Sequence, residues 1–251
     1  MKQNRLQLNA DKTELIWIGP KQSLSKVNIN TIQLWEFDIK VSISARNLGV
    51  VFDSQMTLGP HVSNVVRSCF YQLRQIRTIH SSLTKDAAKT LVIAFVCSIL
   101  DYCNSLNSGL SVHMQTRLQS VFNAAARLVS GRHKFDHITD VLRDLHWLRV
   151  PQRCQYKLAS ITRSCLQGRG PSYLSESLTL VSSTSNMSHL RSAKHQDLLV
   201  PRSRTKRYSR IFAISGPATW NSLPTEIRNL PFSDKSFASK LKTHLFTLSY
   251  N

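Results

Sequence analysis

The chain has 251 residues, 41% of them hydrophobic, which is enough to bury the core of one large or two modest domains and excludes disorder throughout. Its 33 lysines and arginines against 14 acidic residues give a net charge of +19. A positive field of this strength attracts polyanions, so we expect a phosphate-bearing partner. Nucleic acid is favoured over a membrane, because the cations form short clusters and no Lys-rich amphipathic helix stands out.

The apolar stretches and the cysteines indicate the cellular compartment of the protein. The longest apolar stretch, 91–100, is about half of the ~20 residues that a membrane-spanning helix needs. The first residues lack the apolar core of a secretory signal, so we expect an intracellular protein, nuclear or cytoplasmic. The five cysteines are odd in number and widely spaced, which argues against a disulfide framework.

Short apolar runs bounded by polar or turn residues dominate the first part of the chain. They predict strands at 14–18, 32–35, 38–43 and 48–52. Ile39, Val41 and Ile43 alternate with polar residues, which is the period of a strand buried on one face. We therefore expect a small antiparallel sheet.

Beyond residue 60 the apolar period becomes that of helices. It predicts helices at 61–80, 84–100, 111–131, 138–145, 151–166 and 234–248. Thr84 and Ser111 are suited to the N-caps of two of these helices, Gly131 to a C-terminal stop, and Pro151 to a first turn. The expected fold class is α+β, with regions at 1–60 (sheet), 61–167 (helical bundle) and 168–251 (linker and basic, partly irregular extension).

Chemistry-bearing constellations are sparse. His133 and His137 have the spacing of two metal ligands on a helix, but the sequence offers no third ligand and Gly131 breaks the helix. Two-metal phosphoryl transfer requires clustered carboxylates, and no Asp-Asp pair occurs. We therefore assign no catalytic residue, no metal site and no cofactor to this chain.

Four segments together carry a resemblance to a known family. They are Asn9-Ala10-Asp11-Lys12-Thr13-Glu14 and the segments 47–54, 99–106 and 215–224. In combination they resemble the non-LTR (LINE-type, jockey- and CR1-like) retrotransposon reverse transcriptases, over nearly the whole chain. The resemblance implies the C-terminal part of an RNA-directed DNA polymerase, truncated after the motif with the catalytic aspartates. The full-length family uses Mg²⁺.

The resemblance also implies roles for particular residues. Lys12 aligns with a lysine near the phosphates of the incoming nucleotide. Leu48, Gly49 and Val50 match the hairpin that grips the primer strand, where a residue without Cβ permits a tight turn. Region 1–60 then corresponds to a remnant of the polymerase palm, and region 61–167 to a thumb-like bundle.

The basic residues are the expected contacts with nucleic acid. Three lie on one sector of the helix at 61–80, two on the next helix, and four in the most basic segment. They are Arg67, Arg74 and Arg77, then Lys85 and Lys89, and then Arg202, Arg204, Lys206 and Arg207.

We therefore expect a fragment that binds RNA, DNA or their hybrid through phosphates and does not polymerise DNA by itself. One alternative is a helical module that binds other proteins, either the missing N-terminal polymerase portion or a second copy of itself. A chain without its remaining palm strands would expose an apolar sheet edge that such a partner covers. Another alternative is a decayed retroelement relic without a selected function.

Overall fold

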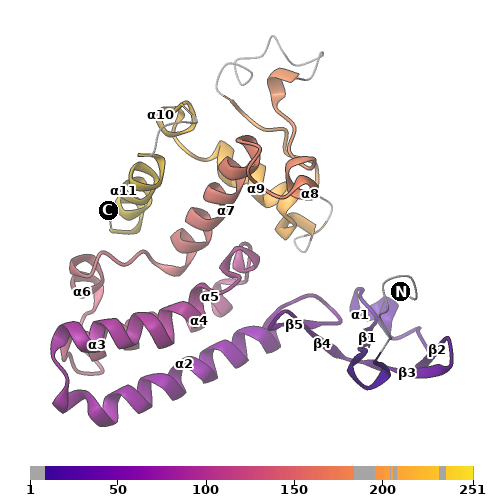
Figure 1. The fold of residues 1–251 in the computed structure, drawn as a ribbon, viewed down its shortest axis with the longest axis horizontal. Coiled ribbons are helices and arrows are strands. Elements are labelled where there is room, and N and C mark those ends of the chain that lie inside the picture. Colours follow the sequence, from indigo (N-terminus) through magenta and orange to yellow (C-terminus); the bar gives the residue numbers. More distant parts are fainter. Residues whose placement is uncertain (1–8, 184–195, 204, 206–207, 232–235, 251) are drawn as a thin grey trace. The chain divides into compact units, whose positions relative to one another are not determined.

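The computed structural model describes residues 9–183, 196–203, 205, 208–231 and 236–250 (Figure 1). The chain forms two compact units, residues 1–65 and 66–251, and the division falls inside α2 (Gly59–Ile79). The first unit carries the strands and the second carries the other long helices (Figure 1). The expectation of an α+β fold, with small sheets followed by helices, is confirmed.

The first unit contains two small sheets and the short helix α1 (Lys21–Leu24). Their strands are β1 (Leu15–Ile16), β2 (Thr31–Leu34), β3 (Phe37–Ser42), β4 (Ser44–Asn47) and β5 (Val50–Asp53). β2 and β3 form an antiparallel hairpin, and β1 joins the other edge of β3 in parallel. β4 and β5 form a separate antiparallel hairpin.

A two-residue turn closes the β4–β5 hairpin. Asn47 pairs with Val50, and the two residues between them have positive φ, 45° at Leu48 and 83° at Gly49. Positive φ at both positions is the signature of a type I′ turn, whose twist matches that of the flanking strands. Gly49 fits its position without steric cost, whereas Leu48 is held there with its side chain 83% exposed. Val50 is buried in the core of this unit.

Asp53 connects the hairpin to the start of α2. Its Oδ1 accepts a hydrogen bond from the Leu58 amide at 2.8 Å, and its Oδ2 accepts one from the Thr57 amide at 3.1 Å. Burial alone raises the pKa of Asp53, but these hydrogen bonds to the carboxylate outweigh it, so the pKa lies below its ordinary value. The charged carboxylate therefore stabilises the segment that leads into α2.

The second unit is helical. Its helices after α2 are α3 (Lys85–Val92), the π-helical turn η4 (Ile93–Cys97), α4 (Ser98–Asp101), α5 (Val112–Ser130), α6 (Thr139–Asp144), α7 (Val150–Leu166), α8 (Ser172–Ser175), α9 (Phe212–Asn221), α10 (Thr225–Arg228) and α11 (Phe237–Tyr250). In the described part of the chain, no helix combines the length and the apolar character needed to cross a membrane.

Four residues predicted to begin or end helices do so in the structure. The Thr84 hydroxyl accepts from the Ala87 amide at 3.2 Å, and the Ser111 hydroxyl accepts from the Met114 amide at 3.4 Å. Gly131 ends α5 with φ of 69°, and Pro151 occupies the first turn of α7. Inside the predicted helix at 84–100, the π turn η4 separates α3 from α4.

A hydrophobic core joins α7 to the C-terminal helices. It includes Leu148 and Ala159 together with Trp220 of α9 and Leu241 of α11. Trp220 is fully buried, and its Nε1 donates to the Gln196 carbonyl at 3.0 Å. Residues before and after position 168 therefore contribute to one core. The division into the three regions 1–60, 61–167 and 168–251 remains a prediction.

Two neighbouring side chains give a structural role to part of the segment 215–224, one of the four segments that resemble the reverse transcriptases. The Asn221 amide pairs with the backbone of Leu198 in both directions, at 2.9 and 2.7 Å. Beside it, the indole of Trp220 fills the core. This part of the segment therefore has a structural role.

Candidate nucleic-acid interface

A basic groove of about 740 Å³ lies in the second unit. It is lined by residues of α2 and the turn after it, and of α5 and the turn after it: Phe70, Leu73, Arg74, Arg77, His80, Ala124, Arg127, Leu128, Gly131, Arg132, His133 and Lys134. Five of these side chains are basic: Arg74, Arg77, Arg127, Arg132 and Lys134. None of the lining residues that the structure describes is acidic. The groove is therefore a concentrated positive surface.

The pattern of α2 explains how its arginines reach this groove. Leu73 and Ile76 are buried, at 3% and 4% exposed, and Arg74 and Arg77 follow each of them by one residue. One residue is a 100° rotation around a helix, so each arginine lies beside the buried stripe and not on it. Both guanidinium groups therefore belong to the exposed flank of a face that the core fixes.

The end of α5 supplies the other cations. Gly131 reverses the chain, and the turn after it is fixed by Asp136, whose Oδ2 accepts from the His133 amide at 2.8 Å. The Asp136 carbonyl also accepts from Arg127 at 3.1 Å. These bonds hold the segment that carries Arg132 and Lys134 beside Arg127. Arg132 and Lys134 are exposed.

The groove cations are not neutralised by the protein. In the described ranges the ion pairs are Arg153–Asp101 and Arg228–Asp197, and neither belongs to the groove. The Arg127 Nε is buried without a hydrogen-bond partner, so one donor of its guanidinium is unused. A cation in the last turn of a helix also interacts favourably with the helix dipole. This interaction explains the positions of Arg77 and Arg127. It does not explain those of Arg132 and Lys134, which lie beyond the end of α5.

The structure brings together part of the predicted set of cations. Arg74 and Arg77 line the groove, and Arg67 is exposed on the same face of α2, about 10 Å further back along the helix. Lys85 and Lys89 lie on α3 outside the lining.

The most basic segment is only partly described. Arg202 is exposed, whereas Arg204, Lys206 and Arg207 lie outside the described residues. Sequence reasoning missed Arg127, Arg132 and Lys134. The one sequence feature that these three residues share is their closeness to Gly131, which ends the predicted helix.

The first family-like segment forms a compact turn in the first unit. The Lys12 amide donates to the Asn9 Oδ1 at 3.2 Å, and the Thr13 hydroxyl donates to the Asn9 carbonyl at 2.8 Å. Glu14 then accepts from the backbone amide of Arg46 in β4 at 2.7 Å. The spacing of this segment is thus explained by the turn it makes. The Lys12 side chain is exposed, and Glu14 connects the turn to the β4–β5 hairpin.

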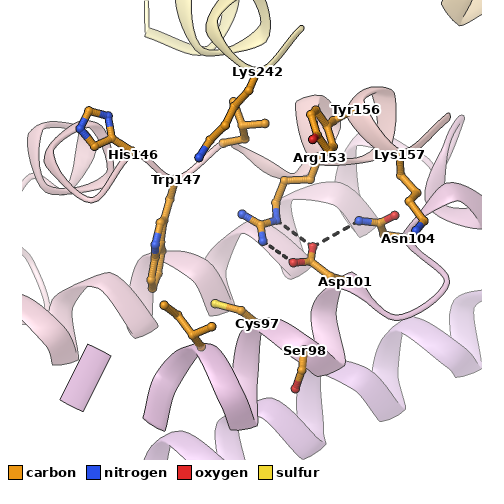
Figure 2. Close-up of a pocket in the computed structure, with 12 residues that line it drawn as sticks. Cys97, Ser98, Asp101, Asn104, His146, Trp147, Arg153, Tyr156, Lys157 and Lys242 are labelled. Carbon is orange, nitrogen blue, oxygen red and sulfur yellow. Dashed lines mark hydrogen bonds and ion pairs between the residues drawn. The ribbon is translucent and has the colours of Figure 1, made fainter. Parts of the chain in front are cut away.

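A second cavity, of about 570 Å³, lies between α4, α7 and α11 (Figure 2). The Arg153 guanidinium forms two hydrogen bonds with the Asp101 carboxylate, one of them from Nε to Oδ1 at 2.8 Å. The Asn104 amide donates to the same Oδ1 at 3.2 Å. The guanidinium also lies 4.6 Å from the centre of the Phe122 ring. Segment 99–106 therefore ends α4 and fastens it to α7.

The charges of Asp101 and Arg153 in this cavity neutralise each other. Burial alone lowers the pKa of Arg153, but the hydrogen bond and the charge of Asp101 outweigh it, so this pKa lies above its ordinary value. Burial raises the pKa of the neighbouring Cys97 to about 11, which keeps it a neutral thiol at pH 7. The five cysteines form no disulfide, and four of them are buried. This cavity is better explained by packing than by nucleophilic chemistry.

Metal-binding side chains do not gather in the part of the chain that the structure describes. No group of three or more His, Cys, Asp or Glu residues there is placed to hold a metal ion.

Comparisons with known proteins give one informative match. No protein-family model matches the chain, and no solved structure matches it. Over 112 residues, 43% of the chain, it is 25% identical to a probable RNA-directed DNA polymerase from transposon BS of Drosophila melanogaster. The match spans 12% of that protein. The chain is thus related to a reverse transcriptase over a short part of that relative's length.

Proposed function

We propose that this chain is the C-terminal part of a LINE-type reverse transcriptase and that its helical unit binds nucleic acid through phosphates in the basic groove. The observation that carries the proposal is the groove itself. Five cations from two distant parts of the chain meet there, and none of them has a carboxylate partner among the described residues. The similarity to a transposon polymerase gives such a surface a natural partner, which is RNA, DNA or their hybrid.

Phosphate binding at this groove has a quantitative signature. Each phosphate that a cation neutralises releases counterions, so affinity falls with salt at a logarithmic slope of about −0.7 per contact for single strands and −0.9 for duplex DNA. Five contacts predict a slope of about −3.5 to −4.5. Between 50 and 200 mM salt, the affinity should therefore fall by about two to three orders of magnitude.

The same proposal assigns this chain to binding and not to catalysis. DNA polymerisation uses carboxylates that hold two metal ions. The described residues contain no such group of carboxylates, so we derive no metal-dependent step from them. Within the proposal, Lys12 and the hairpin turn at Leu48, Gly49 and Val50 are positions beside a polymerase centre formed by other residues. The helices of region 61–167 are its thumb-like part.

The test is fluorescence anisotropy with the whole chain and a labelled nucleic acid across a salt series. We expect binding at 50 mM salt and a slope of about −3.5 or steeper. A flat salt response, or no binding at 50 mM, would overturn the proposal.

A second candidate function, protein binding, is favoured by one feature of the first unit. Three large apolar side chains of this unit are highly exposed: Trp35 at 64%, Ile43 at 87% and Leu48 at 83%. A partner polymerase segment or a second copy of the chain would cover them. Light scattering tests this candidate, because a clean monomer at micromolar concentration would argue against self-association.

A further inference from the structure

We infer that the basic groove binds single-stranded nucleic acid in preference to a double helix, because Phe70 provides a stacking surface for an unpaired base inside it. This inference rests on the proposed function and goes further, since it names the form of nucleic acid. The feature that carries it is an aromatic ring left exposed among unpaired cations.

Phe70 lies outside the core-facing stripe of α2. The residues of that stripe, Cys69, Leu73 and Ile76, are at most 4% exposed, whereas Phe70 is 40% exposed and lines the groove. None of the ring–ring or cation–ring contacts in the described part of the chain involves Phe70. At 40% exposure, part of this ring is open to a ligand.

The ring is placed where phosphate contacts would hold a base against it. Arg74 follows Phe70 by four residues on α2, a spacing that puts their Cβ atoms about 6 Å apart on one face of the helix. Arg127 and Arg132 belong to the other wall of the groove. A strand held at its phosphates by these arginines would therefore run along the groove wall that carries the ring.

Only an unpaired base can use this ring. In a double helix each base face is covered by its neighbours, so a protein meets base edges and phosphates, whereas an unpaired base can stack on an aromatic side chain. The groove volume of about 740 Å³ lies in the range of pockets that hold small ligands. A double helix can offer its phosphates to the groove cations, but its stacked base pairs offer no free base face to Phe70.

The test uses the full chain, Phe70→Ala, and the matched control Phe95→Ala. Phe95 is 49% exposed on η4 and does not line the groove. Three labelled probes of equal length are compared at one salt concentration: a single strand, its duplex, and a single strand with abasic sites. The abasic strand keeps the phosphates and removes the bases, so it separates stacking from charge.

We expect the wild-type chain to bind the single strand more tightly than the duplex. Phe70→Ala should weaken single-strand binding about 5- to 150-fold and leave duplex binding, abasic-strand binding and the salt slope unchanged. Phe95→Ala should match the wild type on all three probes, and Phe70→Trp should retain single-strand binding.

Three results would overturn the inference: tighter binding to the duplex, equal effects of Phe70→Ala and Phe95→Ala on the single strand, or an equal loss on the abasic strand. Steep salt dependence without a Phe70 effect would refute this inference and leave the proposed function standing. Absence of binding to every probe would refute both. Circular dichroism of each variant checks that the helices are retained.

Discussion

The contact between Asp101 and Arg153 should be worth about 2 kcal/mol to the second unit. The Arg153 side chain is 20% exposed and that of Asp101 is 35% exposed. Breaking a fully buried pair costs about 3–5 kcal/mol, and breaking a fully exposed one costs about 0–1 kcal/mol. Asp101→Asn keeps the shape but removes the charge that Arg153 needs. The partial exposure places the cost between these limits.

Thermal unfolding followed by circular dichroism at 222 nm measures this effect, because the signal is dominated by helices. For a chain of this size, 2 kcal/mol corresponds to a fall in Tm of about 4–8 °C. The matched control is Asp144→Asn, which removes the charge of an exposed aspartate on α6 and should stay within about 0.5 kcal/mol of the wild type.

A double-mutant cycle with Arg153→Met isolates the pair. Once Asp101 is Asn, losing the guanidinium should cost less than it does in the wild type. If Asp101→Asn unfolds at the same temperature as Asp144→Asn, the claim that this contact fastens α4 to α7 is wrong.

Two further predictions concern the first unit. Asp53→Ala should cost about 0.5–2 kcal/mol at pH 7. The folded-state pKa of Asp53 is lowered, so the carboxylate stabilises the wild type at pH values above its unfolded-state pKa of about 3.9. This stabilisation is lost as the pH falls below that value. The melting curves of the two proteins should therefore converge in acid. Gly49→Val should lower the stability of the first unit by about 1–2 kcal/mol, since φ is 83° there, and Gly49→Asn should lower it less. Amide hydrogen exchange of β4 and β5 measures both effects. Equal protection in the two variants would contradict the type I′ turn.

The helix ends were predictable because each depends on a few neighbouring residues. Thr84 and Ser111 accept from amides three residues later, and Gly131 adopts the positive φ that ends a helix. β4 was not predicted, because Ser-Ala-Arg-Asn lacks the β-branched and aromatic residues of strands and becomes one only by pairing with β5. The parallel pairing of β1 with β3 likewise depends on contacts that no local pattern encodes.

α9 went unpredicted for a different reason. Gly216 and Pro217 lie in its middle, where both residues normally disfavour a helix. Packing overrides that preference. Pro217 is buried, and a Cβ on Gly216 would come within 3.1 Å of the Thr162 hydroxyl on α7. Glycine therefore fits where α9 approaches α7 closely.

Two of the five cations of the candidate interface were visible in the sequence. Arg74 and Arg77 were predicted from their position beside the buried stripe of α2. Arg127, Arg132 and Lys134 come from a distant part of the chain, and only the folded bundle places them opposite α2. A helical wheel shows which residues share one face of one helix and does not show which other helix that face meets.

Binding of phosphates in the groove is tested by two variants of equal charge, compared in the salt series. The groove variant changes five cations to Gln: Arg74, Arg77, Arg127, Arg132 and Lys134. The control variant changes five exposed lysines outside the groove to Gln: Lys21, Lys26, Lys40, Lys157 and Lys242. Both variants carry a net charge of +14, which is +19 less five.

If the groove binds the phosphates, the salt slope for a single strand falls by about 3.5 in the groove variant and is unchanged in the control. Equal slopes in the two variants would show that the overall charge, and not this groove, attracts nucleic acid, and would contradict the account.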